Sequence, residues 1–201
     1  MDSSIWLVVV LAVVILVVVV VVTVYGAQKR RKDMRALAEQ MGYQYVEQEL
    51  DPAGLLTGFG LFGRGHSRRA TNVLTTETGG NRVTFMDYRW ESGYGKQRRI
   101  EVQSVLHLAS EGFDLPSFAL RPERLGQKIA GLMGQQDIDF EDHPDFSAAY
   151  VLQGSDEPRV RALFDRETRA FLAGRPGLSV EGQGGRLLYY RVRKTVSPDA
   201  V

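Results

Sequence analysis

The residues with the clearest potential for chemistry form an acidic stretch, DIDFEDHPD, at residues 137–145. It contains four aspartates, one glutamate and one histidine. Carboxylate oxygens are preferred ligands of Mg²⁺ and Ca²⁺, and carboxylates and imidazoles also act as general acids and bases. One hypothesis is therefore a metal-dependent hydrolase that uses residues 137–145. Its weak metal-ligand candidates are Asp137, Asp139, Glu141 and His143.

The same stretch also has a purely structural interpretation. Its acids alternate with Ile138 and Phe140, so a strand here would bury both apolar side chains and expose the acids, which discourage edge-to-edge pairing of sheets. Pro144 would end this strand. The chain contains no H-E-x-x-H, G-x-S-x-G or Walker sequence, and its three histidines are scattered. We therefore favour the structural interpretation, in which no residue is catalytic and no metal or cofactor is bound. On this interpretation the sequence favours a non-enzymatic protein, and an enzyme remains an open alternative.

A glycine-rich segment, GFGLFG at residues 58–63, matches the G-x-G-x-x-G fingerprint of nucleotide-binding loops. That fingerprint needs a strand before it and a helix after it, so that phosphate meets a helix N-terminus. Neither flank has the required pattern. We expect instead a loop whose Phe59, Leu61 and Phe62 fill a core or touch lipid.

The N-terminal part predicts a membrane anchor. Ile5 to Val24 is a run of 20 residues whose only polar member is Thr23, and a helix of that length spans about 30 Å of hydrocarbon. Basic residues follow the run, and basic flanks stay in the cytoplasm. We expect a single-pass protein of the inner or plasma membrane, with its N-terminus outside and its C-terminal domain in the cytoplasm. The basic residues of this anchor are Lys29, Arg30, Arg31 and Lys32.

Composition narrows the remaining choices. The absence of cysteine excludes disulfides, thiolate metal sites and cysteine nucleophiles. A net charge of +1 gives no overall basic field, so we expect no nucleic-acid partner. The charge is uneven, however: residues 64–99 carry a net +5 and residues 111–145 a net −5. Two such blocks could complement one another within the fold or between copies, so a protein partner or a homo-oligomer remains open.

The hydrophobic pattern predicts the α+β class: an N-terminal transmembrane helix followed by an antiparallel β-meander domain with two or three packed helices. Alternating runs separated by glycine-containing breaks predict a hairpin series. The expected strands are residues 43–47, 71–77, 82–90, 98–108, 113–120, 150–153, 178–180 and 186–192. The expected domain limits are 1–28 for the anchor, 29–42 for a juxtamembrane basic amphipathic helix, 43–194 for the cytoplasmic domain and 195–201 for a disordered tail. Two small β-rich subunits, with a break near 134–147, are an alternative for the domain.

Three finer expectations concern side-chain faces and helices. In residues 98–108, Ile100 and Val102 should lie on the buried face, with Glu101, Gln103 and His107 on the exposed one. A helix should open at Pro122 and end at Gly134. Another should start at the cap formed by Ser155 and Asp156 and end at Gly174, with Phe171 facing inward.

The hairpin tip at residues 91–96 should project beyond the sheet, and it carries the composition that interfaces favour. We take Tyr94, Lys96, Arg98 and Arg99 as interaction candidates. The alternative, which is slightly favoured for Tyr94, is that its ring folds back onto the sheet and only packs. The favoured function is thus a membrane-anchored cytoplasmic binding or interaction module of unknown ligand. A further alternative is docking on anionic lipid by Arg64, Arg68, Arg69, Arg98 and Arg99.

Three segments together resemble an uncharacterised family of bacterial single-pass membrane-anchored proteins: NVLTTETGGNRVTFMDYRWESGYGK, LPSFALRPE and DIDFEDHPDFSAAYVLQGSDEPRVRALF. The resemblance runs from about Met34 to Tyr190 and lies in strands, turns and core aromatics. It implies a bacterial source and one domain architecture behind an anchor. It implies no activity and brings no catalytic residues.

Overall fold

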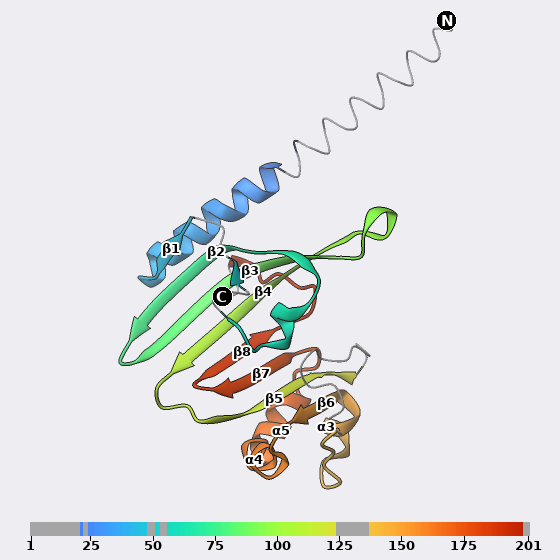
Figure 1. Cartoon of the computed structure of the whole chain (residues 1–201). Coiled ribbons are helices and arrows are strands. Elements are labelled where there is room, and N and C mark those ends of the chain that lie inside the picture. The colour runs from blue at the N-terminus through green and yellow to red at the C-terminus, as the bar shows by residue number, and fades with distance from the viewer. Residues whose placement is uncertain (1–20, 22–23, 48–50, 53–55, 124–136, 199–201) are drawn as a thin grey trace, which may run out of the picture.

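The structure, a computed structural model, describes residues 21, 24–47, 51–52, 56–123 and 137–198 of the 201-residue chain. Its centre is one antiparallel sheet of eight strands in the order β1-β2-β3-β4-β8-β7-β5-β6 (Figure 1). Helices lie beside this sheet, which confirms the predicted α+β class. A single sheet runs through the residues on both sides of 134–147.

The strands have these bounds: β1 (Gln44–Val46), β2 (His66–Thr78), β3 (Asn81–Ser92), β4 (Arg99–Ser110), β5 (Leu115–Pro122), β6 (Tyr150–Gly154), β7 (Ser179–Gly184) and β8 (Arg186–Tyr190). Among the described residues, the α-helices are residues 24–41, α3 (Pro144–Ala149), α4 (Glu157–Leu163) and α5 (Arg166–Ala173). Two short 3₁₀ helices are η1 (Gly60–Gly63) and η2 (Gly95–Gln97).

The predicted meander is correct for β2, β3 and β4 and wrong for the next strand. β4 pairs with β8, and β5 pairs with β7, so the C-terminal hairpin separates β4 from β5. Sequence neighbours are usually sheet neighbours, and this expectation fails because the loop from β4 to β5 crosses over the width of two strands.

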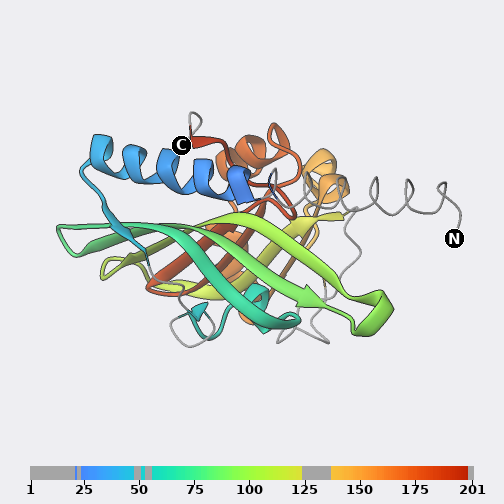
Figure 2. The ribbon, with the colours of Figure 1, turned by 90° about the horizontal axis from the view of Figure 1, so that it is seen from above.

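The two faces of the sheet are covered differently. One face, which we call the η1 face, bears Val73, Met86, Tyr88 and Val105 and packs against Phe59, Leu61 and Phe62. The other, which we call the helix face, packs against residues 24–41 over β2 to β4 and against α3 to α5 over β5 to β7. Figure 2 shows the long helix and η1 on opposite sides of the sheet. The prediction that the glycine-rich segment fills a core with its apolar side chains is confirmed.

The helix at residues 24–41 lies along the sheet with Met34 and Ala38 fully buried against Leu74 and Phe85. Gly42, at φ 70°, ends it with the left-handed conformation that glycine tolerates best. Most of the apolar run predicted to be the anchor lies outside the described residues. Within the described ranges, no helix combines the length and the apolar character needed to cross a bilayer.

Several finer predictions are wrong. The single helix expected before Gly174 is two, because Asp165 caps a second helix by accepting a hydrogen bond from the Thr168 backbone N–H. Phe171 is exposed, with Arg175 over its ring. Pro122 ends β5 rather than opening a helix, and the remainder of that predicted helix lies largely outside the described residues.

The faces of β4 are also opposite to the prediction near the hairpin. Ile100 and Val102 are exposed, whereas Glu101 and Gln103 are buried. The reason is Arg193, whose side chain pairs with Glu101 at 2.6 Å and whose backbone N–H donates to Gln103. The expected tail is ordered at its start, because the Val196 backbone N–H donates to the Ser104 hydroxyl at 2.9 Å.

Candidate functional site

A two-point ion pair on the helix face joins the basic segment after the apolar run to the sheet. The Arg30 guanidinium binds both carboxylate oxygens of Asp87, at 2.6 and 2.7 Å. Charge-assisted pairs with this two-point geometry are stronger than neutral hydrogen bonds. The hydrogen bonds to Asp87 raise the pKa of Arg30, which keeps the guanidinium charged. Arg30 is therefore engaged within the fold, whereas its neighbours Lys29, Arg31 and Lys32 are exposed.

Other groups complete the coordination of Asp87. The Asn72 amide donates to it at 2.7 Å and the Ser104 hydroxyl at 2.9 Å. Asn72 adopts φ 50°, a left-handed conformation that asparagine tolerates better than most residues, next to the irregular pairing of β2. Arg30 also donates to the Val196 carbonyl at 3.0 Å. One buried carboxylate thus ties together the long helix, three strands and the C-terminal segment.

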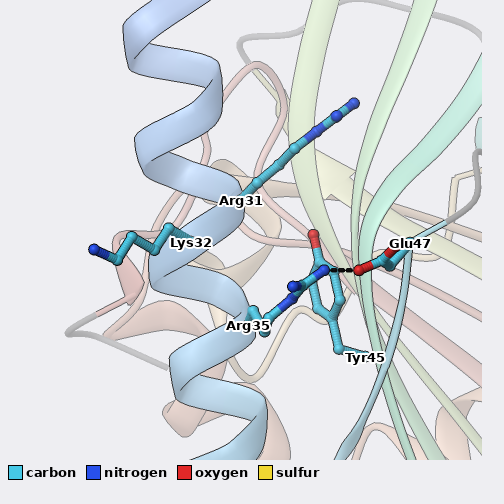
Figure 3. A pocket seen from close by; sticks show the side chains of 5 residues that line it. All are labelled: Arg31, Lys32, Arg35, Tyr45 and Glu47. Atoms are coloured by element: carbon cyan, nitrogen blue, oxygen red, sulfur yellow. Dashed lines mark ion pairs between the residues drawn. The ribbon is translucent and has the colours of Figure 1, made fainter.

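A pocket of about 330 Å³ opens between the same helix and β1 (Figure 3). Its lining contains three basic side chains and one acid: Arg31, Lys32, Arg35 and Glu47, with Tyr45 beside them. Figure 3 shows Lys32 turned away from the sheet and Arg35 paired with Glu47. Arg35 also lies over the Tyr45 ring, 5.4 Å from its centroid. Because one cation is already paired, the pocket has only a modest excess of positive charge.

A second cavity, of about 320 Å³, lies on the η1 face between β1 to β4 and the start of the η1 segment. Most of its walls are apolar. They are formed by Val46, Leu56, Ala70, Val73, Met86 and Ala109. Polar atoms enter from Thr75, Thr84 and His107, and Arg82 and Arg186 add positive charge. A mostly apolar cavity with a few converging polar groups is the usual form of a small-molecule site.

His107 is the unusual member of this lining. It is buried, its ring packs edge-on against Phe59 at 5.9 Å, and its Nε2 has no hydrogen-bond partner among the described residues. Burial lowers its pKa to about 4, and the nearby charges of Arg186 and Arg82 act in the same direction. The imidazole is therefore neutral at pH 7 and presents an unsatisfied polar atom next to the cavity.

Glu181 holds the η1 segment in place from β7. Its carboxylate accepts hydrogen bonds from the Gly60 backbone N–H at 2.5 Å, the Leu61 backbone N–H at 3.1 Å and the Tyr190 hydroxyl at 2.8 Å. Burial is the largest effect on this group and raises its pKa above the ordinary range. In the segment that matches the nucleotide-binding fingerprint, the backbone N–H groups of Gly60 and Leu61 thus donate to a protein carboxylate and are not available to bind a phosphate.

The acidic stretch does not assemble into a metal site. Ile138 and Phe140 are buried and the acids between them exposed, as predicted, although residues 137–140 form no strand and only run beside β6. Asp137 accepts a hydrogen bond from the Leu152 backbone N–H. Asp142 pairs with Arg169 at 2.5 Å. Across the described ranges, no group of three or more His, Asp or Glu side chains is placed to hold a metal ion.

The hairpin tip between β3 and β4 is exposed and basic. The Tyr94 ring stacks on His66 of β2, with centroids 4.5 Å apart, and is otherwise open to solvent. Arg98 binds Glu91 through two hydrogen bonds of 2.5 and 2.6 Å and holds the pKa of that carboxyl below its usual range. Of the four interaction candidates, only Arg98 is occupied by this pairing, while Lys96 and Arg99 stay exposed.

Sequence reasoning missed the residues at the centre of both polar clusters. Asp87 and Glu181 lie inside strands, and each meets partners that are distant in the sequence. The only available signal was the position of Asp87 within the apolar and aromatic run FMDYRW, where a lone acid must find a buried partner. Nothing of that kind singles out His107.

Comparisons with known proteins bear on the fold. No protein-family model matches the chain, and no curated protein matches it. Among solved structures, the chain is similar to the crystal structure of the mycobacterial trehalose monomycolate transport factor A, with a TM-score of 0.59 and 16% sequence identity over 82% of this chain and 80% of that chain. At this level of identity, the similarity shows a shared α+β fold.

Proposed function

We propose that the protein is a membrane-tethered, non-enzymatic transport module that binds an amphiphilic ligand in the cavity on the η1 face. The cavity carries this proposal, because it combines apolar walls, a buried neutral imidazole and two arginines. Two further observations support it. The structural neighbour is a transport factor, and the apolar run predicts attachment to a membrane, where amphiphilic ligands are found.

The lining assigns a part of the ligand to each group. Val73 and Met86 line the floor of the cavity and would contact an alkyl chain. The neutral His107 ring would contact the ligand at the cavity wall, and its Nε2, which is shielded from solvent, would have to become exposed to bond a ligand oxygen. Within the described residues Arg82 pairs with the exposed Glu77, a surface pair of small net energy, so it remains able to attract an anionic head group.

The proposed topology places the cavity on the cytoplasmic side of the inner membrane. It follows from the basic residues after the apolar run. A reporter that is active only in the cytoplasm, fused after Val201, should give signal in intact cells. Signal from a reporter that is active only outside the cytoplasm would overturn the topology and leave the cavity unaffected.

Filling the cavity tests the function. Ala109→Trp adds an indole to the cavity wall, and Ala162→Trp adds the same group to an exposed position of α4 as the matched control. The full chain in lipid nanodiscs is irradiated with a photoactivatable long-chain acyl lipid, and the labelled peptides are mapped by mass spectrometry. Wild type and Ala162→Trp should be labelled on β2 and β4 near the cavity, and Ala109→Trp should not.

The outcome that contradicts the proposal is equally specific. If labels fall only on residues 5–24, or if Ala109→Trp keeps the wild-type labelling with an unchanged melting temperature, the cavity does not hold the lipid. If Ala109→Trp lowers the melting temperature, it is replaced by Thr84→Leu, which removes a polar lining atom and fills the cavity with a smaller group than an indole.

A further inference from the structure

The β3–β4 hairpin extends past the rest of the sheet at a specific end of the molecule. In Figures 1 and 2 its tip points to the same end as the start of the helix at residues 24–41, from which the chain continues to the apolar run. β8 pairs with β4 only at Val105–Ala109, so the part of the hairpin near the tip has no β8 neighbour. On the other side, β2 pairs with β3 as far as His66 and Glu91, so the part that projects beyond β2 is the tip at residues 92–98.

The contact between Arg30 and Asp87 allows the reach of the tip to be estimated, because it places these two residues at one level. From Asp87 to Ser92, where β3 ends, is five residues of extended chain, or about 17 Å. From Arg30 to Val24 is six residues of helix, or about 9 Å. Since both run towards the same end, the end of β3 reaches about 8 Å beyond Val24, and the tip lies further out. A bilayer that held residues 5–24 would lie close to the tip.

The surface of the hairpin fits such an environment. Tyr94, Ile100 and Val102 are 79%, 52% and 40% exposed, and the latter two lie on the helix face, the side that also carries the helix leading to the anchor. Lys96 and Arg99 are exposed next to them. The acids nearby are neutralised, because Glu91 is bound by Arg98 and Glu101 is bound by an arginine of the C-terminal segment. Tyrosine, aliphatic side chains and lysine or arginine are the mixture found where proteins meet the headgroup layer.

We propose that the hairpin tip, residues 92–102, is a second membrane contact, in which Tyr94 and Ile100 enter the interfacial layer of the bilayer that holds residues 5–24 and Lys96 and Arg99 bind anionic headgroups. The proposal rests on the anchor and is independent of the ligand in the cavity. A helix and a hairpin at two separate points fix the orientation of the sheet relative to the membrane, which a single helix does not.

The absence of native cysteine makes the test direct, since a single introduced cysteine can be labelled without a background. Gln97→Cys places an environment-sensitive fluorophore at the tip. Thr78→Cys, exposed at the other end of the sheet, is the matched control, and Val14→Cys reports whether the anchor is inserted. Each variant of the full chain is reconstituted into anionic vesicles with nitroxide quenchers attached to the headgroup or deep in the acyl chain.

The expected result is a blue shift and headgroup-level quenching at Gln97→Cys, deep quenching at Val14→Cys, and neither at Thr78→Cys. Adding Lys96→Gln and Arg99→Gln to the tip variant should reduce its quenching in anionic vesicles and change it little in zwitterionic ones. A tip label that stays in water while the Val14→Cys label is quenched overturns the hairpin contact and keeps the anchor. A tip label shielded only after a partner protein is added also overturns it, and an unquenched Val14→Cys label overturns the anchor and the hairpin contact together.

Discussion

Replacing Arg30 by alanine should weaken the attachment of the long helix to the sheet. The change removes two hydrogen bonds to Asp87, one to the Val196 carbonyl at 3.0 Å and one to the Ser104 hydroxyl at 3.3 Å. It also leaves a carboxylate that is 5% exposed without its counter-charge. The helix then keeps only its apolar contacts, chiefly those of Met34 and Ala38.

Removing one partner of a buried ion pair typically costs 3–5 kcal/mol. The Arg30 side chain is 23% exposed, so we take the lower end, about 3 kcal/mol in the free energy of unfolding. For a chain of this size, that corresponds to a fall of about 6–12 °C in melting temperature. Arg30→Gln combined with Asp87→Asn should recover part of the loss, because no buried charge is then left unpaired.

Thermal unfolding of the full chain in detergent, followed by near-ultraviolet circular dichroism of the aromatic side chains in the sheet, measures this change. Arg31→Ala is the matched control, since it removes an exposed arginine one position further along the same helix and should change stability by no more than about 0.5 kcal/mol. If Arg30→Ala and Arg31→Ala have the same melting temperature, the ion pair makes no net contribution to stability, and the helix is held by its apolar face alone.

Three other predictions concern the interior. Burial lowers the pKa of His107 to about 4, so its contribution to stability is complete above pH 6.5 and is lost as the pH falls towards 4. Urea unfolding should therefore show that wild type loses about 3 kcal/mol more than His107→Gln over that pH range. Parallel curves of unfolding free energy against pH for the two proteins would refute this. Glu181→Gln directs an amide N–H₂ at the backbone N–H groups of η1 and should lower the free energy of unfolding by about 1–3 kcal/mol. Amide hydrogen exchange in η1 should become faster. Unchanged exchange would mean that the carboxylate does not hold η1 in place. Gly182→Ala would place a Cβ 2.1 Å from the Phe118 ring and should destabilise the protein by about 1–3 kcal/mol. The control Gly112→Ala, whose Cβ meets a hydroxyl at 3.6 Å, should have a melting temperature near that of wild type. Equal melting temperatures for the two variants would contradict the close contact.

Local patterns were sufficient to predict most strands, because the alternation of apolar and polar residues and the glycines of turns can be recognised in short stretches of consecutive residues. The turn at Gly79 and Gly80, where both residues adopt positive φ, lies between two strands whose ends at this turn were predicted to within one residue. The start of β2 was missed by five residues. Sheet order was not predictable in the same way. The pairing of Leu106 with Tyr189 joins residues from distant parts of the chain, and no local feature of β4 specifies its neighbour.

The site was less predictable than the fold for a related reason. Alternation in β4 shows that Glu101 and Val102 face opposite ways, but it does not show which of them is covered. The cover comes from Arg193, far along the chain, and it makes the polar side the buried one. In the sequence, Asp87 and Arg30 likewise resemble two separate solvated charges. Their pairing depends on how the helix lies on the sheet, which no local pattern specifies.

The position of the β7–β8 hairpin has a consequence for how the chain folds. β7 and β8 follow all other strands in the sequence, yet they lie between β4 and β5 in the sheet. Before residues 179–190 are available, the β1–β4 and β5–β6 parts each present an unpaired edge to solvent, and neither can pair with the other in the native arrangement. Unpaired edges on incomplete chains promote association between molecules. A fragment that ends before Ser179 therefore lacks the middle of the sheet rather than its margin, and truncation there should yield an aggregating chain instead of a smaller working domain.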